Sequence, residues 1–229
     1  VIDGLYGRLN LASSLMAVIQ SEDAQSVFGS AVNFPAIESL VSDATAIAEK
    51  VDDKRALSFA YGTAAELTAL QSGSATAVEN LYSEALASAQ SVQAFDIAYD
   101  WAYRLAQLNE SIERNDRAAE YYVSSLAALD QVREDLVAVN SELRFDFAQK
   151  IEPVYRDYLQ LLVNESDPNL AQAVEVRESL QLAQLENFLR CGRLVSPASD
   201  LDSVATMHVI TLDDSIEVIV SRLNETYGY

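Results

Sequence analysis

Apolar residues recur at spacings of three and four along most of the first 190 positions, which is the period of an amphipathic helix. The connections between these periodic segments are short, so neighbouring helices are expected to form antiparallel pairs. The pattern predicts one helix that begins after the N-cap Asn33, one that begins at Asn115, and six further helices over residues 3–20, 54–71, 75–91, 93–110, 136–164 and 168–190.

Prolines and small polar residues mark where several of these helices bend, begin or end. Pro153 lies inside the helix over 136–164, and proline both lacks an N–H donor and crowds the preceding turn, so a kink is expected near residues 149–152. Asp167 followed by Pro168 is typical of an N-cap and a first-turn proline. Cys191-Gly192 is expected to end that last helix.

After Cys191 the hydrophobic period changes from the helical one to strict alternation. Residues 193–205 contain proline, aspartate and serine and are expected to be a linker. Two alternating segments follow, over 206–212 and 215–221, and Asp213-Asp214 between them predicts a β-hairpin with a two-residue loop. A two-stranded hairpin is barely stable alone, so it is expected to pack on the helices, pair with another chain, or belong to a larger sheet.

Small and aromatic residues recur in the predicted hairpins at offsets typical of a tetratricopeptide repeat. Tyr61-Gly62 and Leu105-Ala106 stand where that repeat places a Leu-Gly step, and a small residue there lets the paired helix approach closely. Ala118, Tyr122 and Ser125 follow at the offsets of its small, aromatic, small triad. The triad of the preceding hairpin keeps the same internal spacing but comes four residues late, and it consists of Val78, Tyr82 and Ala85. An unrelated α-solenoid or helix bundle is the alternative.

The 229 residues carry 35 Asp plus Glu against 15 Lys plus Arg, a formal charge of −20. This charge repels phosphate backbones and anionic membranes, so neither nucleic acid nor membrane is expected as a partner. The simpler interpretation is a solvated acidic surface. The alternative is an acidic groove that attracts a basic peptide or loop. The apolar stretches are shorter than a membrane span, no basic-then-apolar leader occurs, and the cytoplasm is the expected compartment.

Catalytic and metal-binding motifs are absent from the sequence. The single cysteine, Cys191, allows neither an intramolecular disulfide nor a thiolate zinc site, and the single histidine, His208, makes a His-based metal site implausible. These two residues could form a nucleophile and base only with an oxyanion hole and a flanking signature, and neither is present. Adjacent Asp52-Asp53 is expected in a turn. We therefore expect no catalytic residue, no metal and no cofactor in this chain.

Aromatic residues are concentrated in the middle hairpins, where some must be core. Trp101 and Tyr103 are two positions apart on one helix, and Tyr121 is adjacent to Tyr122, so neither pair can point in one direction. One member of each pair could line a groove, with Arg104 near enough to join it, because aromatics and arginine dominate binding hot spots. Core or ordinary surface is the simpler interpretation. The candidate peptide-groove residues are Trp101, Tyr103, Arg104 and Tyr121.

The order of these segments resembles the junction between a tetratricopeptide-like region and a CHAT domain, a caspase-like fold that follows such repeats in bacterial proteins. The most specific matches are Ile151-Glu152-Pro153-Val154-Tyr155-Arg156 and the helix Val174–Leu189, followed by the strand Ile216–Val220. The resemblance implies a His and Cys pair on later strands, beyond Tyr229. Cys191 and His208 match neither position.

The sequence therefore predicts an all-α fold, a tetratricopeptide-like α-solenoid of antiparallel helix pairs with a short C-terminal β-hairpin. The expected domains are a helical repeat domain over 1–192, a linker over 193–205, and the first hairpin of a truncated CHAT-like domain over 206–229. The expected function is a non-catalytic scaffold that binds a protein or peptide and restrains a caspase-like domain in the full-length protein. If the acidic residues form a groove, the bound partner is expected to be basic. The alternatives are a module that self-associates through the C-terminal hairpin, or part of a cysteine peptidase whose dyad lies beyond residue 229.

Overall fold

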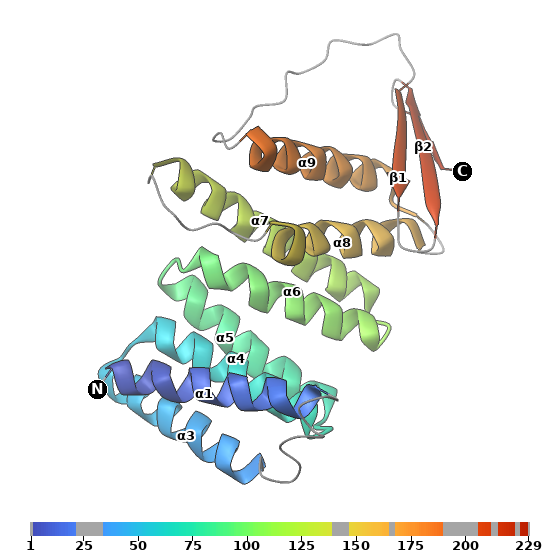
Figure 1. Cartoon of the computed structure of the whole chain (residues 1–229). Helices are drawn as coiled ribbons and strands as arrows, with labels where there is room; N and C mark the ends of the chain where they lie inside the picture. The colour runs from blue at the N-terminus through green and yellow to red at the C-terminus, as the bar shows by residue number, and fades with distance from the viewer. Residues whose placement is uncertain are drawn as a thin grey trace. The chain divides into compact units, whose positions relative to one another are not determined.

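The computed structural model describes residues 2–21, 34–138, 147–164, 168–189, 206–211, 215–222 and 225–228. These residues fall into two compact units, Val1–Arg114 and Asn115–Tyr229, which are described separately below. The first unit is all helical in its described part, and the second combines helices with a small antiparallel sheet (Figure 1). The expected all-α array of antiparallel helix pairs with a C-terminal β-hairpin is confirmed. None of the described helices is long and apolar enough to cross a membrane.

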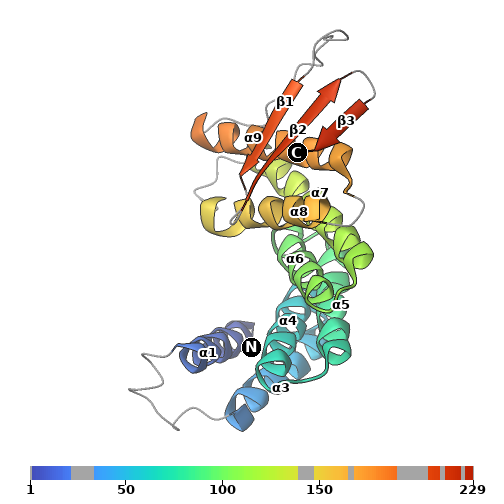
Figure 2. The ribbon, with the colours of Figure 1, turned by 90° about the vertical axis from the view of Figure 1, so that its right-hand side faces the viewer.

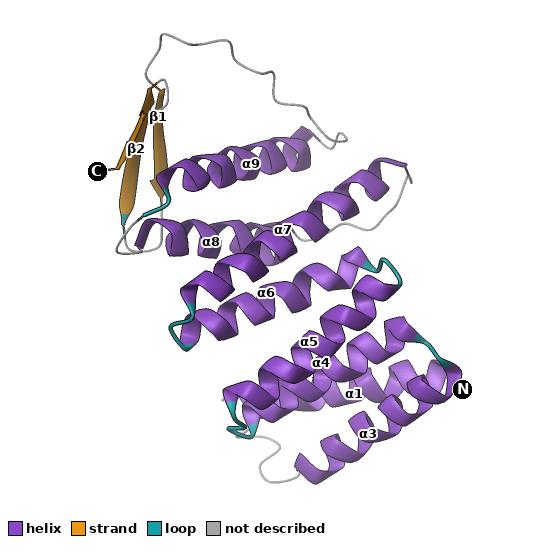
Figure 3. Ribbon diagram, turned by 180° about the vertical axis from the view of Figure 1, so that it is seen from behind, coloured by secondary structure: helices purple, strands orange, loops and turns teal. Residues whose placement is uncertain are grey.

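The first unit is a succession of packed helices, each antiparallel to the next (Figures 1 and 3). Helices that follow one another in the chain pack together, and α1 also contacts α4, the first helix of the following pair. Helices α1 and α3 therefore belong to the same array as the hairpins that follow. The helices are α1 (Ile2–Gln20), α3 (Phe34–Val51), α4 (Lys54–Leu70), α5 (Ala75–Ser91) and α6 (Phe95–Ser111).

Successive helices of this unit end in the same way. Just past the ends of α3, α4, α5 and α6, one non-glycine residue has a positive φ, and the N–H that follows it bonds to a carbonyl five residues earlier. This is the Schellman motif, which satisfies carbonyls that the helix end leaves unbonded. The four bonds run from Asp53 N to Ala48 O, Gly73 N to Thr68 O, Ala94 N to Ala89 O and Arg114 N to Asn109 O.

N-caps complete two of these turns. The carboxylate of Asp53 accepts the N–H of Ala56 at 3.0 Å, and the hydroxyl of Ser74 accepts that of Ala77 at 3.2 Å. Helices α4 and α6 begin 41 residues apart, at Lys54 and Phe95. A tetratricopeptide unit is shorter, about 34 residues, so each helix of this array has room for about one more turn.

The expected small and aromatic repeat positions form the core of this unit. Gly62 and Ala106 are buried where α4 and α6 meet their neighbours, and Val78, Tyr82 and Ala85 are buried on α5. Further apolar clusters, which include Leu5, Leu9, Met16, Ile37 and Val41, bury one side each of α1 and α3. The helical period in the sequence therefore identifies the core correctly.

In the second unit, α7 (Asn115–Ala138), α8 (Glu152–Asn164) and α9 (Leu170–Leu189) pack in chain order. The expected triad of Ala118, Tyr122 and Ser125 is fully buried on α7. The ring of Tyr122 stacks on that of Tyr158 from α8, with ring centroids 5.2 Å apart. The hydroxyl of Tyr158 in turn accepts a hydrogen bond from Gln172 Nε2 on α9 at 2.6 Å.

The single helix expected over 136–164 is not what the structure contains. Residues 136–138 are the last turn of α7, and residues 139–146 lie outside the described part of the chain. A π-helical turn, η2 (Phe147–Ile151), then leads directly into α8. Pro153, the second residue of α8, offers no N–H to the carbonyl four residues earlier. The irregular turn thus occurs where the kink near 149–152 is expected, and wider π-type turns are a known response to such a gap.

The N-cap of α9 also differs from the sequence prediction. The helix begins at Leu170, and Asn169 Oδ1 accepts the N–H of Gln172 at 3.2 Å, so Asn169 is the cap and Pro168 precedes the helix. Asp167 lies outside the described residues. So do the expected helix end at Cys191-Gly192, the linker over 193–205 and the loop Asp213-Asp214.

The C-terminal strands form a three-stranded antiparallel sheet in the order β1-β2-β3 (Figure 2). The strands are β1 (Thr206–Thr211), β2 (Ile216–Arg222) and β3 (Glu225–Gly228). The expected hairpin is β1 with β2, paired from Thr206↔Ser221 to Thr211↔Ile216. The four-residue β3 is an addition that the sequence does not predict, because it is too short to show alternation. The domain division at 192 and 205 stays a prediction.

Candidate functional site

Trp101, the first of the expected groove residues, is part of the core of the first unit. Its side chain is 6% exposed, its indole Nε1–H donates to Ser58 Oγ at 2.9 Å, and the Ser58 hydroxyl donates to Ala85 O at 2.8 Å. The ring of Tyr82 stacks on the indole at a centroid distance of 6.0 Å. Trp101 therefore joins α6 to α4 and α5, and the expectation that it lines a groove is wrong.

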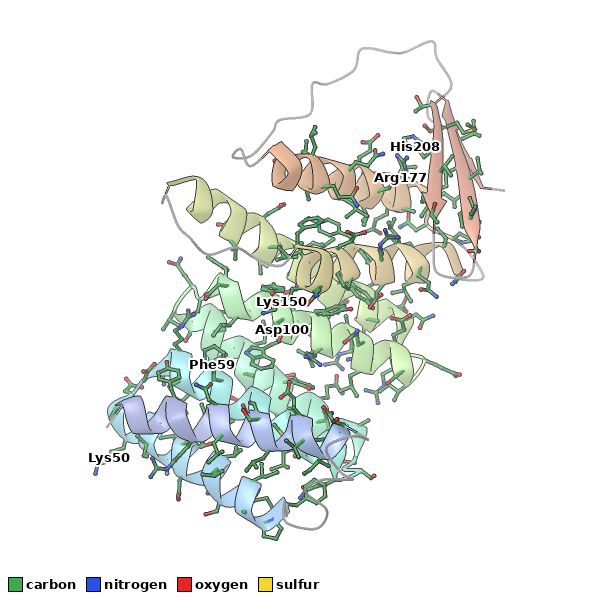
Figure 4. All side chains as sticks on the ribbon, viewed as in Figure 1. Lys50, Phe59, Asp100, Lys150, Arg177 and His208 are labelled. Carbon is green, nitrogen blue, oxygen red and sulfur yellow. The ribbon has the colours of Figure 1, made fainter. Side chains whose placement is uncertain are left out.

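A row of partly exposed side chains runs along α4 and α6. We call it the α4–α6 face, and Figure 4 marks Phe59 and Asp100 on it. Its two helices are linked at both ends by ion pairs. The residues of the α4–α6 face are Arg55, Phe59, Glu66, Asp96, Asp100, Tyr103 and Arg104.

At one end of this face, Arg55 of α4 holds Asp96 of α6 in a two-pronged ion pair. Arg55 Nη1 donates to Asp96 Oδ1 at 2.9 Å, and Nη2 donates to Oδ2. These hydrogen bonds lower the pKa of the Asp96 carboxyl below its usual range. The guanidinium carbon of Arg55 also lies 5.9 Å from the centre of the Phe59 ring, which packs edge-on against Tyr6 of α1. At this end the charges of Arg55 and Asp96 balance, and the packing of Phe59 against Tyr6 holds α4 against α1.

At the other end, one guanidinium lies between two carboxylates. Arg104 Nη2 is 3.8 Å from Glu66 Oε1, and Arg104 Nε is 3.9 Å from Asp100 Oδ1. Burial raises the pKa of the Glu66 carboxyl, Arg104 opposes this rise, and the negative charge of Asp100 adds to it. Burial also raises the pKa of the Tyr82 hydroxyl, and Glu66 adds to that rise. This end therefore groups two carboxylates about one arginine in a half-buried position.

The remaining expected groove residues lie in different places. Tyr103 is half-buried on α6 and raises the pKa of the exposed Arg104 guanidinium electrostatically, so the two side chains lie near each other on the α4–α6 face. Tyr121 lies half-buried on α7 of the second unit, where the guanidinium carbon of Arg117 is 6.0 Å from its ring centre. Its neighbour Tyr122 is fully buried, so one member of that pair is core, as the sequence analysis expects.

The carboxylates and Arg55 were not among the expected site residues. Asp100 and Arg104 are four positions apart on one helix, which is a signal for a side-chain ion pair that the sequence contains. The partners Glu66 and Asp96 are recognisable only once α4 and α6 lie side by side, because their contacts join residues about 40 positions apart.

Of Cys191 and His208, which the sequence analysis weighs as a nucleophile and base, the structure describes only His208. His208 is buried on β1, and its ring nitrogen Nε2 lies 3.3 Å from Ser221 Oγ of β2. Burial lowers the pKa of this imidazole, Glu178 of α9 opposes the change, and Arg177 adds to it. Cys191 lies outside the described residues. Within the described ranges no three His, Cys, Asp or Glu side chains are grouped so as to hold a metal ion.

Comparison with known proteins supports the fold alone. No protein-family model matches the chain, and no curated protein matches it. A crystal structure of BtubC (BKLC) from P. vanneervenii is similar, with a TM-score of 0.53 and 18% sequence identity. The match covers 86% of this chain and 73% of BtubC, so the similarity extends over most of both proteins.

Proposed function

We propose that this chain is a non-catalytic protein-interaction scaffold that binds a basic segment of a partner on the α4–α6 face. The observation that carries the proposal is the grouping of the Glu66 and Asp100 carboxylates about Arg104, at 3.8 Å and 3.9 Å from its guanidinium nitrogens. A carboxylate oxygen can accept more than one hydrogen bond, so a Lys or Arg side chain from a partner would add charge-assisted contacts to this group.

Apolar surface beside these charges favours a peptide over a small cation. Tyr103 is half-buried and adjacent to Arg104, and Phe59 is half-buried on α4 nearer the Arg55–Asp96 pair. Aromatic side chains supply contact area at little cost in conformational entropy, and charged groups around them set orientation and specificity. A short extended segment with a basic residue and an apolar residue fits this composition.

Binding of labelled peptides tests the proposal. A fluorescein-labelled peptide of alternating Lys and Leu should bind, and its counterpart with Glu in place of Lys should not. Asp100→Asn should weaken binding of the Lys peptide by about tenfold, since a charged contact of this kind contributes about 1–2 kcal/mol. Glu84→Gln, an exposed carboxylate on α5 outside the face, removes the same charge and should leave the affinity unchanged. Equal weakening by both variants would show only a general charge effect and refute the proposed site.

We further propose that the scaffold belongs to a tetratricopeptide–CHAT protein and positions and restrains its caspase-like domain. The array of helix pairs followed by an antiparallel sheet supports this order of domains. On this proposal the present chain has no peptidase activity of its own. Turnover of a peptide substrate by this chain, abolished by Cys191→Ala, would overturn it.

Self-association through the C-terminal strands is a second candidate function. Met207 and Ile216 are 66% and 64% exposed on the sheet, which is unusual for large apolar side chains. If this surface joins two copies, Met207→Thr combined with Ile216→Thr should lower the molecular mass measured by light scattering. A mass that does not change with these substitutions would exclude this surface as the interface.

A further inference from the structure

Two arginines from the helices of the second unit reach the backbone of β1. Arg156 Nη1 of α8 donates to Thr211 O at 3.1 Å, and Arg177 Nε of α9 donates to Val209 O at 2.9 Å. Figure 4 marks Arg177 on α9 beside His208 of β1. Neither contact involves a side chain of the strand. The arginines therefore contact the part of β1 that a neighbouring strand would normally bind.

The geometry of an antiparallel pair indicates which edge these carbonyls occupy. Along such a strand, residues alternate between those whose backbone groups bond to the partner strand and those whose groups point to the opposite edge. Val209 and Thr211 are two positions apart, so their carbonyls point to the same edge. Both accept hydrogen bonds from arginines of α8 and α9, which indicates the edge of β1 that β2 does not occupy. In the described sheet β1 has β2 on one side only.

Each arginine is itself held in place by a residue four positions away on its own helix. Arg156 Nε donates to Glu152 Oε1 at 2.8 Å, and Arg177 Nη1 donates to Gln181 Oε1 at 2.9 Å. A guanidinium has five N–H donors in a rigid fork, so it can bond to a side chain and a carbonyl at once. The two side chains are thus oriented toward β1 before they bind it.

An open edge at β1 would be a hazard. Unpaired carbonyl and N–H groups on an edge strand are a template for pairing with another chain, and apolar, β-branched strands are the most prone to it. The sequence of β1 is Thr-Met-His-Val-Ile-Thr, without a lysine, proline or acidic residue to prevent pairing. Met207 and Val209 are exposed. Protection of this edge must therefore come from elsewhere in the chain.

We propose that Arg156 and Arg177 form an edge clamp, which closes β1 to antiparallel pairing with β1 of a second copy and ties the sheet to α8 and α9. The two guanidinium groups occupy the carbonyls that a second β1 would need as acceptors. An incoming strand has to displace both arginines from the carbonyls of Val209 and Thr211. The clamp does not depend on the partner of the α4–α6 face, so each proposal can fail without the other.

Light scattering over a wide range of protein concentrations tests the clamp. The parent chain should not associate through the edge of β1. Arg156→Ala combined with Arg177→Ala should form a dimer, with an association constant at least about tenfold above that of the parent, since each lost bond involves a charged donor. Arg117→Ala, which removes an α7 arginine that contacts Tyr121, is the matched control and should behave as the parent does. Association unchanged in the double variant would refute the clamp.

A third substitution shows whether any dimer uses the edge. Because the backbone of Val209 faces the open edge, Val209→Pro removes an N–H that β2 does not need, and proline is tolerated at such edge positions. Adding Val209→Pro to the double alanine variant should lower its association constant to that of the parent chain. A dimer that persists would place the association elsewhere and refute the proposal, as would a parent dimer that Val209→Pro alone dissociates.

A charge-conserving pair separates loss of the clamp from loss of folding. Arg156→Lys with Arg177→Lys keeps both positive charges, but a single ammonium replaces the planar fork. This variant should fold and associate to an intermediate degree. Fluorescence of Trp101, the single tryptophan, should be the same in all variants, which shows that the first unit is intact. Association of the lysine variant equal to that of the parent would show that positive charge suffices and that the bonds to β1 are not the cause.

Discussion

Gly62 of α4 and Trp101 of α6 approach each other so closely that no other residue fits at position 62. A Cβ atom added to Gly62 would lie 2.2 Å from Cη2 of the indole. Such a distance is far inside van der Waals contact, and the indole cannot turn away, because its Nε1–H is bonded to Ser58 and its ring stacks on Tyr82. This contact sets how closely α4 and α6 pack.

Gly62→Ala should therefore destabilise the chain, although alanine is the better helix former. The helix propensity favours alanine by about 1 kcal/mol, whereas forcing a methyl group into a packed core costs about 1–3 kcal/mol. We expect a net loss of about 1–2 kcal/mol in the free energy of unfolding, because a contact of 2.2 Å puts the packing cost in the upper part of this range. Urea unfolding followed by Trp101 fluorescence measures it at the site of the change.

Gly7→Ala is the matched control for this substitution. Gly7 lies within α1, and a Cβ there would meet nothing within 4 Å. Only the helix propensity acts, so the variant should be more stable by up to about 1 kcal/mol. If both glycine variants change stability in the same direction, the contact with Trp101 is not what limits residue 62.

Ser58→Ala should also destabilise the first unit. The Ser58 hydroxyl accepts the Trp101 Nε1–H and donates to Ala85 O, so its loss leaves a buried donor without an acceptor. An unsatisfied buried group of this kind costs about 1–3 kcal/mol. Ser111→Ala removes an exposed hydroxyl that donates to Leu108 O and should change stability by less than about 0.5 kcal/mol. Equal effects on the midpoint of urea unfolding would contradict the buried relay.

The two ends of the α4–α6 face should respond to pH in opposite ways. The folded-state pKa of Asp96 lies below its ordinary value of 3.8, so its contribution is present above that pH and is lost as the pH falls further. The folded-state pKa of Glu66 lies above its ordinary value of 4.5, so the ionised Glu66 carboxylate destabilises the fold at neutral pH. This destabilisation is lost as the pH falls from the folded-state pKa to below 4.5, where the carboxyl is protonated in both states.

Neutral variants measure this difference. At pH 7, Asp96→Asn should lower the free energy of unfolding by up to about 1 kcal/mol, the upper range for a partly exposed ion pair. Glu66→Gln should leave it unchanged or raise it. The loss in Asp96→Asn should shrink when unfolding is repeated below the ordinary pKa of aspartate. A larger loss for Glu66→Gln than for Asp96→Asn would reverse the assignment of the two ends.

His208 should titrate below the ordinary value of 6.5 in the folded chain, because its imidazole is buried. A base with a lowered folded-state pKa binds its proton more readily when unfolded, so the sheet should lose stability as the pH falls below 6.5. His208 is the only histidine, so one NMR titration curve reports it. His208→Gln should make the loss of stability below pH 6.5 smaller. A measured pKa at or above 6.5 would show that Glu178 outweighs burial.

The helices and the first two strands could be predicted because their signals are local. The boundaries of α4 and α5 follow from the caps Asp53 and Ser74 and from the apolar period between them, which belong to the sequence alone. The start of the helix expected over 136–164 was misjudged because residues 136–138 continue the apolar period of α7, to which they belong. The four-residue β3 exists only because β2 lies beside it, and no local pattern reports that partner.

The candidate site shows the same division more sharply. The sequence placed Trp101 and Tyr103 on different sides of one helix, and this is correct, since the side of a helix follows from its period. It could not decide which side was core, because large aromatic residues are common both in cores and at interfaces. Burial of Trp101 against Gly62 decided that question.

By itself, then, the sequence determined the helical hairpins, their core positions, the hairpin of β1 and β2 and the strongly acidic charge. Each depends on residues within a few turns of one another or on composition. Only the tertiary structure decided that Glu66 and Asp100 share Arg104, and that Arg156 and Arg177 bind the edge of β1. The arginine contacts with β1 join residues 55 and 32 positions apart. The contact between Glu66 and Arg104 likewise joins two different helices. Charged side chains on a surface pair with whatever the packing of helices brings near, and no period along the chain encodes that choice.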